Sequence, residues 1–80
     1  MTKTEYVKCE KLMEDAIQKV EDSKREYSRY EFLSQKGDAI KAEVEQRKAD
    51  QHYGYAEGIN QVLATLGFKH DRMKELSELL

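Results

Sequence analysis

Two histidines and one cysteine are the side chains of this sequence best suited to hold a transition metal, namely His52, His70 and Cys9. Metal sites gather such ligands in clusters, and two histidines on one helix face would stand three or four residues apart. Here the three residues are scattered, and neither histidine has another at those spacings. We therefore expect no metal and no cofactor. Cys9 is expected in the core, because free cysteines are usually buried.

Nucleophilic and acid–base catalysis also lack their usual signals. The serines fall within helical periodicity without a glycine-rich turn before them, and no glycine-rich phosphate loop occurs. Neighbouring acids such as Glu14 and Asp15, or Glu43 and Glu45, are one or two residues apart. They project from different sides of a helix and read best as a solvated surface. These patterns predict a protein that is not an enzyme.

A basic cluster near the C-terminus indicates an alternative function. Lys69, Arg72 and Lys74 stand close together, and cations at this spacing could contact the phosphates of a nucleic acid. Asp71 and Glu75 interrupt the cluster, and over the whole chain 14 basic residues stand against 16 acidic ones. A small nucleic-acid-associated regulator is therefore the alternative to a protein-binding protein.

The composition predicts an all-α fold in one domain of residues 1–80. Proline is absent, glycine occurs four times and 38% of the residues are charged, which is typical of long helices. A chain this short buries too little surface for a strong solitary core, so we expect a partner to contribute. No signal peptide and no long apolar run is visible, and a single cysteine fits a reducing compartment. We expect a cytoplasmic protein with no membrane partner.

The first helix is expected over residues 3–36. Thr2 and Glu5 fit a capping box, and Gly37 fits the left-handed residue that ends a helix. Between these ends, apolar or small side chains recur three and four residues apart, which predicts one face packed against another helix. They are Tyr6, Cys9, Met13, Ala16, Val20, Ser23, Tyr27, Tyr30 and Ser34.

The second helix is expected over residues 38–66, with Asp38 as its cap, and a third over 71–80, capped by Asp71. The short turn at Gly37 predicts an antiparallel hairpin about 45 Å long. His52, Ala56 and Leu63 are expected to point away from the first helix. One arc of the second helix is expected to face the first instead. That arc holds Ile40, Val44, Arg47, Gln51, Tyr55, Gly58, Ile59, Val62 and Leu66.

Two glycines, Gly54 and Gly58, lie inside the second helix, where each costs about 1 kcal/mol relative to alanine. We expect them to allow close helix packing, within the hairpin or in a dimer; a local hinge or kink is the alternative. Leu63 and its neighbours would need cover that a short third helix provides only in part. The simplest solution is a homodimer in which two hairpins form a four-helix bundle.

Phe32 and Tyr53 fall outside the expected apolar faces and are predicted to be exposed. Tyrosine and arginine are enriched among the residues that dominate binding energy at protein interfaces. We expect Phe32 and Tyr53 to anchor a protein partner, with Arg25 and Arg29 as polar contacts at the rim.

The run from Tyr53 to Leu63, YGYAEGINQVL, resembles the closing helix of small uncharacterised helical-hairpin proteins of bacterial phages and mobile elements. In those proteins a long charged helix precedes a Tyr/Gly-rich helix that ends in leucines. The resemblance covers the second half of the chain and implies an accessory protein that binds and modulates another protein. Together with the residue patterns, it predicts a noncatalytic protein–protein interaction module. A coiled-coil structural scaffold is a further alternative.

Overall fold

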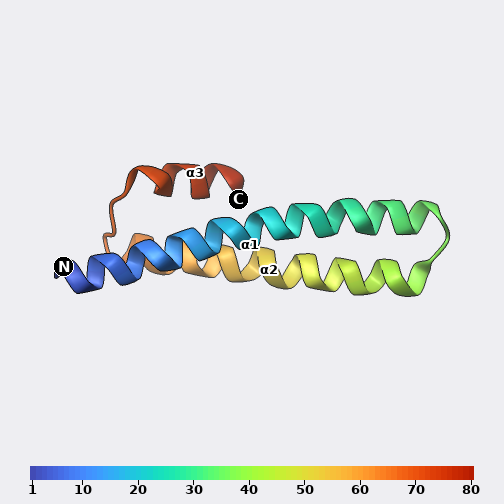
Figure 1. Ribbon diagram of the computed structural model, residues 1–80, viewed down its shortest axis with the longest axis horizontal. Helices are drawn as coiled ribbons and strands as arrows, with labels where there is room; N and C mark the ends of the chain where they lie inside the picture. The colour runs from blue at the N-terminus through green and yellow to red at the C-terminus, as the bar shows by residue number, and fades with distance from the viewer.

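Three α-helices and no strands make up the fold of the computed structural model, which describes residues 1–80 (Figure 1). They are α1 (Lys3–Gln35), α2 (Ala39–Thr65) and α3 (Asp71–Leu79). α1 and α2 form an antiparallel hairpin in a molecule that extends 52 × 17 × 16 Å, and α3 folds back beside the hairpin end that holds the N-terminus. The predicted all-α hairpin with a short third helix is confirmed, and each helix ends within one residue of its expected position.

The ends of α1 and the start of α2 follow from local capping. The Thr2 hydroxyl accepts a hydrogen bond from the Glu5 N–H at 3.1 Å, and the Glu5 carboxylate accepts from the Thr2 N–H at 3.3 Å. Gly37 ends the turn with φ +82°, a conformation that costs other residues energy. Asp38 accepts from the Lys41 N–H at 3.1 Å, which starts α2 one residue later.

The start of α3 differs from the expected one. His70, not Asp71, is the cap: its Nδ1 accepts a hydrogen bond from the N–H two residues later at 3.0 Å. Asp71 is instead the first helical residue, where its negative charge favours the positive end of the helix dipole. The His70 ring also stacks with Tyr6 and Phe68, and its Nε2 lies 3.0 Å from Glu10. The imidazole therefore ties the linker before α3 to the first turns of α1.

The face that α2 turns toward α1 was predicted wrongly. Four residues spaced seven apart are buried on it: Ala42, Ala49, Ala56 and Leu63. Most of the residues expected to line the contact lie outside, with Ile40 81% and Leu66 58% exposed, whereas Ile59 is partly buried against the core. Alanine carries little hydrophobic signal in a sequence pattern, yet a heptad of alanines lets two helices approach closely. The larger core side chains are supplied by α1 instead.

The apolar core occupies only the part of the hairpin that α3 covers, here called the core end. It joins residues of all three helices in one cluster: Cys9, Met13, Ala16, Ile17, Val20, Ala56, Leu63, Phe68 and Leu76. Beyond Val20, toward the turn at Gly37, the buried side chains of α1 are polar, Ser23 and Glu26, while those of α2 are Ala42 and Ala49. This second part of the hairpin is here called the tip end. No helix of the chain combines the length and apolarity needed to cross a membrane.

Candidate protein interface

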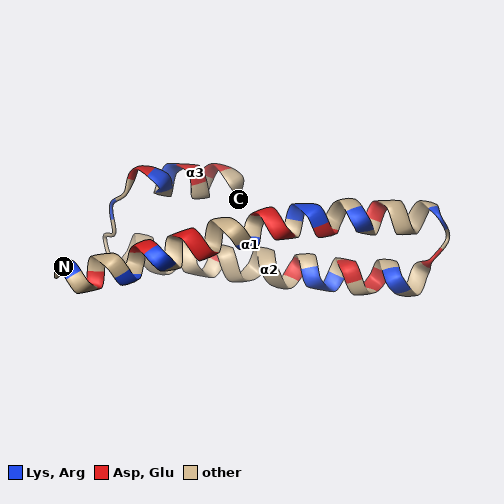
Figure 2. Ribbon diagram, in the orientation of Figure 1, with Lys and Arg blue, Asp and Glu red and all other residues tan.

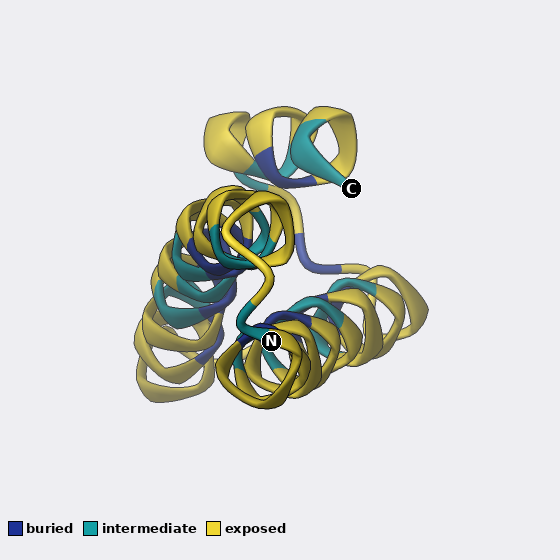
Figure 3. Ribbon diagram, turned by 90° about the vertical axis from the view of Figure 1, so that its right-hand side faces the viewer, coloured by how far each residue is buried: buried dark blue, intermediate teal, exposed yellow.

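One side of the hairpin carries α3, and the side that faces away from it is uncovered (Figure 3). We call this second side the open face. On α2 it presents a row of large apolar side chains that runs from the tip end to the core end. These are Ile40, Val44, Tyr55, Val62 and Leu66, between 44% and 81% exposed. Arg47 and Gln51 interrupt the row between Val44 and Tyr55, so it has two apolar segments. Scattered exposed apolar residues are ordinary, but large apolar residues gathered on one side of a helix are typical of an interaction surface.

The part of the open face contributed by α1 is mostly charged and follows a heptad spacing. Its residues recur three and four apart along one side of the helix: Leu12, Asp15, Lys19, Asp22, Glu26, Arg29 and Leu33. Asp15 lies near Tyr55 of α2, and its carboxylate raises the pKa of the Tyr55 hydroxyl above its ordinary value. The open face is thus apolar along α2 and charged, with apolar ends, along α1.

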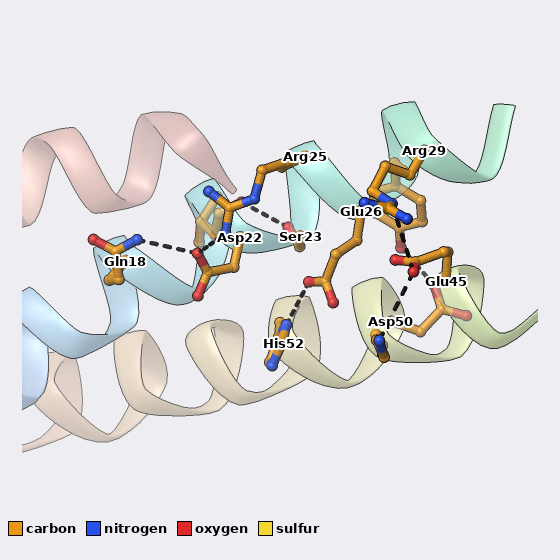
Figure 4. A network of polar contacts seen from close by, with 12 residues as sticks. Gln18, Asp22, Ser23, Arg25, Glu26, Arg29, Glu45, Asp50 and His52 are labelled. Atoms are coloured by element: carbon orange, nitrogen blue, oxygen red, sulfur yellow. Dashed lines mark hydrogen bonds and ion pairs between the residues drawn. The ribbon is translucent and has the colours of Figure 1, made fainter. Parts of the chain in front are cut away.

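Polar contacts join α1 to α2 at the tip end (Figure 4). Nδ1 of His52 lies 2.5 Å from a carboxylate oxygen of Glu26, and Nε of Arg29 lies 3.6 Å from Glu45. Seven charged or titratable side chains line a shallow groove of about 340 Å³, with no hydrophobic residue among them: Asp22, Arg25, Glu26, Arg29, Glu45, Lys48 and His52. The groove's acids and bases largely satisfy one another, so it offers no net charge that would select an ionic ligand.

A hydrogen bond between Tyr27 and Asp50 adds a further link between α1 and α2. Tyr27 donates to the Asp50 carboxylate at 2.5 Å, and this bond raises the pKa of the phenol. On α1 itself, the side-chain amide of Gln18 and then the Arg25 guanidinium stabilise the Asp22 carboxylate and lower its pKa. These contacts replace an apolar seam in the half of the hairpin that has no large core residues.

The four residues expected to anchor a protein partner do not form one patch. Phe32 is exposed near the turn, with the Lys36 ammonium 5.0 Å from its ring centroid. Arg25 lies 2.6 Å from Asp22, and Arg29 is paired with Glu45, so both guanidinium groups already have acidic partners. Tyr53 is only partly exposed, because its hydroxyl donates to the backbone carbonyl of Leu80 and α3 lies over it. The expectation that Tyr53 is an exposed anchor is therefore wrong.

Gly54 and Gly58 do not pack closely against anything within this chain. A Cβ added at either position would meet no neighbouring atom within 4 Å. Both residues are exposed, α2 runs unbroken through them, and their backbone φ is not positive. Close packing of these glycines inside the hairpin is therefore ruled out, and no helix break occurs there. The two glycines lie in open space beside the apolar row of α2.

The predicted phosphate contacts are partly neutralised. Arg72 lies 3.0 Å from Glu75, an ion pair that raises the pKa of the guanidinium, and Lys74 lies 4.0 Å from Glu78. Lys69 is exposed in the linker before α3. Charges of both signs are mixed along α1, α3 and the tip-end half of α2, whereas the core-end half of α2 carries few charges (Figure 2). No group of three His, Cys, Asp or Glu side chains is placed to hold a metal ion, and Cys9 is a buried free thiol.

Comparison with known proteins gives no family for this chain. No family model, curated protein or solved structure matches it. The surfaces of the molecule itself are therefore the basis for inferring its function. The open face was missed from the sequence because its apolar residues were assigned to the contact with α1. The signal that identifies it is the second heptad series, Ala42, Ala49, Ala56 and Leu63, which occupies that contact instead.

Proposed function

We propose that this protein is a noncatalytic protein–protein interaction module, a small accessory protein that acts by binding another protein through its open face. The single observation that carries the proposal is the exposed apolar row on α2. Leaving such a row in water forgoes about 25 cal/mol for each Å² of apolar surface that a partner would cover. A helix that keeps five large apolar side chains outside its own core is suited to a groove or a helix of a partner.

The uneven distribution of the core supports the same function. The core end is closed by α3, whereas the tip end is held by ion pairs and hydrogen bonds between α1 and α2. Exposed ion pairs contribute little to stability, so the tip end has the most to gain from apolar contacts with a partner. Ile40 and Val44 supply such contacts in that half of the molecule.

Site-specific photo-crosslinking tests the proposal. A photoreactive phenylalanine analogue replaces Val44 on the open face, and in a matched variant it replaces Val7. Val7 is similarly exposed, at 41% against 46%, but lies on α1 outside the series that faces the open side. On irradiation in the cells that produce the protein, position 44 is expected to give a protein adduct and position 7 none. Equal labelling at both positions, or none at position 44, would contradict the proposal.

A further inference from the structure

We propose that the open face is covered by a second copy of this chain, placed antiparallel about a two-fold axis that crosses α2 at Tyr53. This inference goes beyond the proposed function: it concerns the free protein, in which a second copy covers the open face until another protein displaces it. A two-fold interface must be self-complementary: whatever residue i contacts, the equivalent residue of the other copy must contact in return. The open face meets this condition on both of its helices.

The apolar residues of the α2 row are placed symmetrically about residue 53, so the row has the same pattern in both directions along the helix. Measured from residue 53, Ile40 and Leu66 are equally far on opposite sides, and so are Val44 and Val62. An antiparallel α2 of a second copy therefore places Ile40 on Leu66 and Val44 on Val62. Near the axis, the amide of Gln51 meets the hydroxyl of Tyr55, again at equal distances. Apolar residues meet apolar ones at both ends, and polar groups meet in the middle.

Gly58 fits the same arrangement. It lies five residues beyond the axis, while the long side chain of Arg47 lies six residues before it. The space above Gly58 is open in the single chain, since an added Cβ would touch nothing within 4 Å. A second copy would lay Arg47 across that space. The dimer thus gives the exposed glycine a packing role that it lacks within the hairpin.

The antiparallel pairing of the two α2 helices about residue 53 also determines which residues of the two α1 helices must lie opposite one another. Tyr27 contacts Asp50, Arg29 contacts Glu45 and Glu26 contacts His52. Counting along the antiparallel helices therefore brings the axis to between residues 21 and 25 of α1. Two hairpins related by an axis between their layers place α1 on α1 and α2 on α2. The α1 series of one copy must therefore match its own reverse about a point near Asp22 and Ser23.

The charges and apolar residues of α1 satisfy that requirement. About the midpoint between residues 22 and 23, Leu12 is opposite Leu33 and Lys19 is opposite Glu26. Asp15 lies within one residue of the position opposite Arg29. The two Asp22 carboxylates meet near the axis, and each already lies 2.6 Å from the guanidinium of its own Arg25. The register set by the apolar row of α2 thus brings Lys19 toward Glu26, which is already bonded to His52 in its own chain, and places the two Asp22 carboxylates near each other.

The dimer would also cover the exposed apolar residues of the tip end. Leu33, Ile40 and Val44 of one copy would meet the core-end apolar residues Leu12, Val62 and Leu66 of the other. One such cluster forms at each end of a four-helix bundle, and α3 of each copy stays on the outside. Each hairpin would thereby cover the half of its partner that has no large apolar core.

Cysteine cross-linking tests the orientation and the register. In a Cys9→Ala background, Val44→Cys with Val62→Cys is expected to give a covalent dimer on mild oxidation. The two cysteines are 18 residues apart on one helix, or about 27 Å, so they cannot pair within a chain. Val44→Cys with Tyr55→Cys, shifted by one heptad, and Val44→Cys alone are expected to form no covalent dimer. Cross-linking of either control instead would overturn the antiparallel register.

The molar mass of the unmodified chain in solution is the second measurement. Light scattering over a tenfold concentration range is expected to give twice 9.4 kDa. Lys19→Glu is expected to weaken the dimer by about threefold or more, because two opposite-charge pairs are lost, while Lys24→Glu makes the same change of charge outside the open-face series and leaves it unchanged. A monomer at every concentration would overturn the second copy as occupant.

The two proposals fail in different ways. A monomeric chain whose position 44 photo-crosslinks to a foreign protein would retain the proposed function and overturn the dimer. A dimer with the expected cysteine pattern, but with adducts only to itself, would support the dimer and overturn the binding of another protein through this face.

Discussion

The hydroxyl of Tyr53, on α2, donates a hydrogen bond to the backbone carbonyl oxygen of Leu80, at the end of α3. This bond joins residues 27 positions apart and holds the last turn of the chain against the hairpin. It also explains why an aromatic side chain outside the α1 contact is not free for a partner. α3, although short, is fixed at both ends: by His70 and its aromatic neighbours at the start, and by Tyr53 at the finish.

Replacing Tyr53 with phenylalanine tests this attachment. Loss of the hydroxyl is expected to lower the free energy of unfolding by about 1 kcal/mol, since a buried carbonyl loses its donor while the ring remains. Tyr30→Phe is the matched control, because Tyr30 is also half-buried but forms no side-chain hydrogen bond. Urea denaturation followed by circular dichroism measures both variants. Equal losses in the two would show that the Tyr53 bond contributes nothing.

The buried alanines of α2, spaced seven residues apart, predict that larger side chains at these positions will destabilise the fold. Ala56 is fully buried against α1, so Ala56→Leu is expected to overpack the contact and cost about 1–3 kcal/mol. Ala64→Leu adds the same atoms at an exposed position and is expected to change stability by less than about 0.5 kcal/mol. Thermal unfolding of the two variants should therefore separate by several degrees. A more stable Ala56→Leu protein would mean that α2 turns another face toward α1.

Replacing Gly54 and Gly37 with alanine is expected to change the free energy of unfolding in opposite directions. Gly54 lies within a helix with open space around it, so Gly54→Ala should raise the free energy of unfolding by about 1 kcal/mol. Gly37 has φ +82°, so Gly37→Ala should lower it by about 1–2 kcal/mol. Chemical denaturation gives both values. A destabilising Gly54→Ala would indicate a close neighbour at that position.

Stability is expected to fall in alkaline solution. The pKa of Tyr27 is raised because its phenol donates to the Asp50 carboxylate, and the pKa of Tyr55 is raised by the nearby Asp15 carboxylate. A raised pKa in the folded state means that the neutral phenol stabilises the fold below about pH 10, and that this contribution is lost as the pH rises through the folded-state pKa. The measurement is the free energy of unfolding against pH, together with phenolate absorbance.

Asp50→Asn and Asp15→Asn provide the controls for that titration. Each removes the carboxylate that disfavours the phenolate, so the corresponding tyrosine should ionise at a lower pH and the alkaline loss of stability should become smaller. Unchanged titration curves in both variants would show that neither carboxylate acts on its tyrosine in solution.

The helix ends could be predicted from the sequence because their signals are local. The capping box of Thr2 and Glu5 and the glycine at 37 act within a few residues, and no distant contact overrides them. The face of α2 could not be assigned in the same way. Two arcs of that helix are candidates for the contact, and the large residues of the outer arc outweigh Ala42, Ala49 and Ala56 in any count of hydrophobicity. Only packing against α1 decides between them.

The partial burial of Tyr53 beneath α3 and the Arg29–Glu45 ion pair could also not be predicted from the sequence pattern. The first depends on where α3 packs and the second on which residues of α2 lie opposite α1. Arg25 differs, because its partner Asp22 lies three residues earlier on the same helix. In contrast, the exposure of Phe32 follows from its position outside the heptad series of α1, and the structure confirms it.

The confinement of the apolar core to one end gives the hairpin two regions of unequal local stability. Amide protons between about residues 27 and 48 are protected only by helical hydrogen bonds, ion pairs and small contacts, so they should exchange with solvent through partial openings. Amide protons near Met13, Val20 and Leu63 should exchange only when the whole chain unfolds. The two helices would then separate locally from the turn at Gly37 to about Ser23, while α3 still holds the core end together.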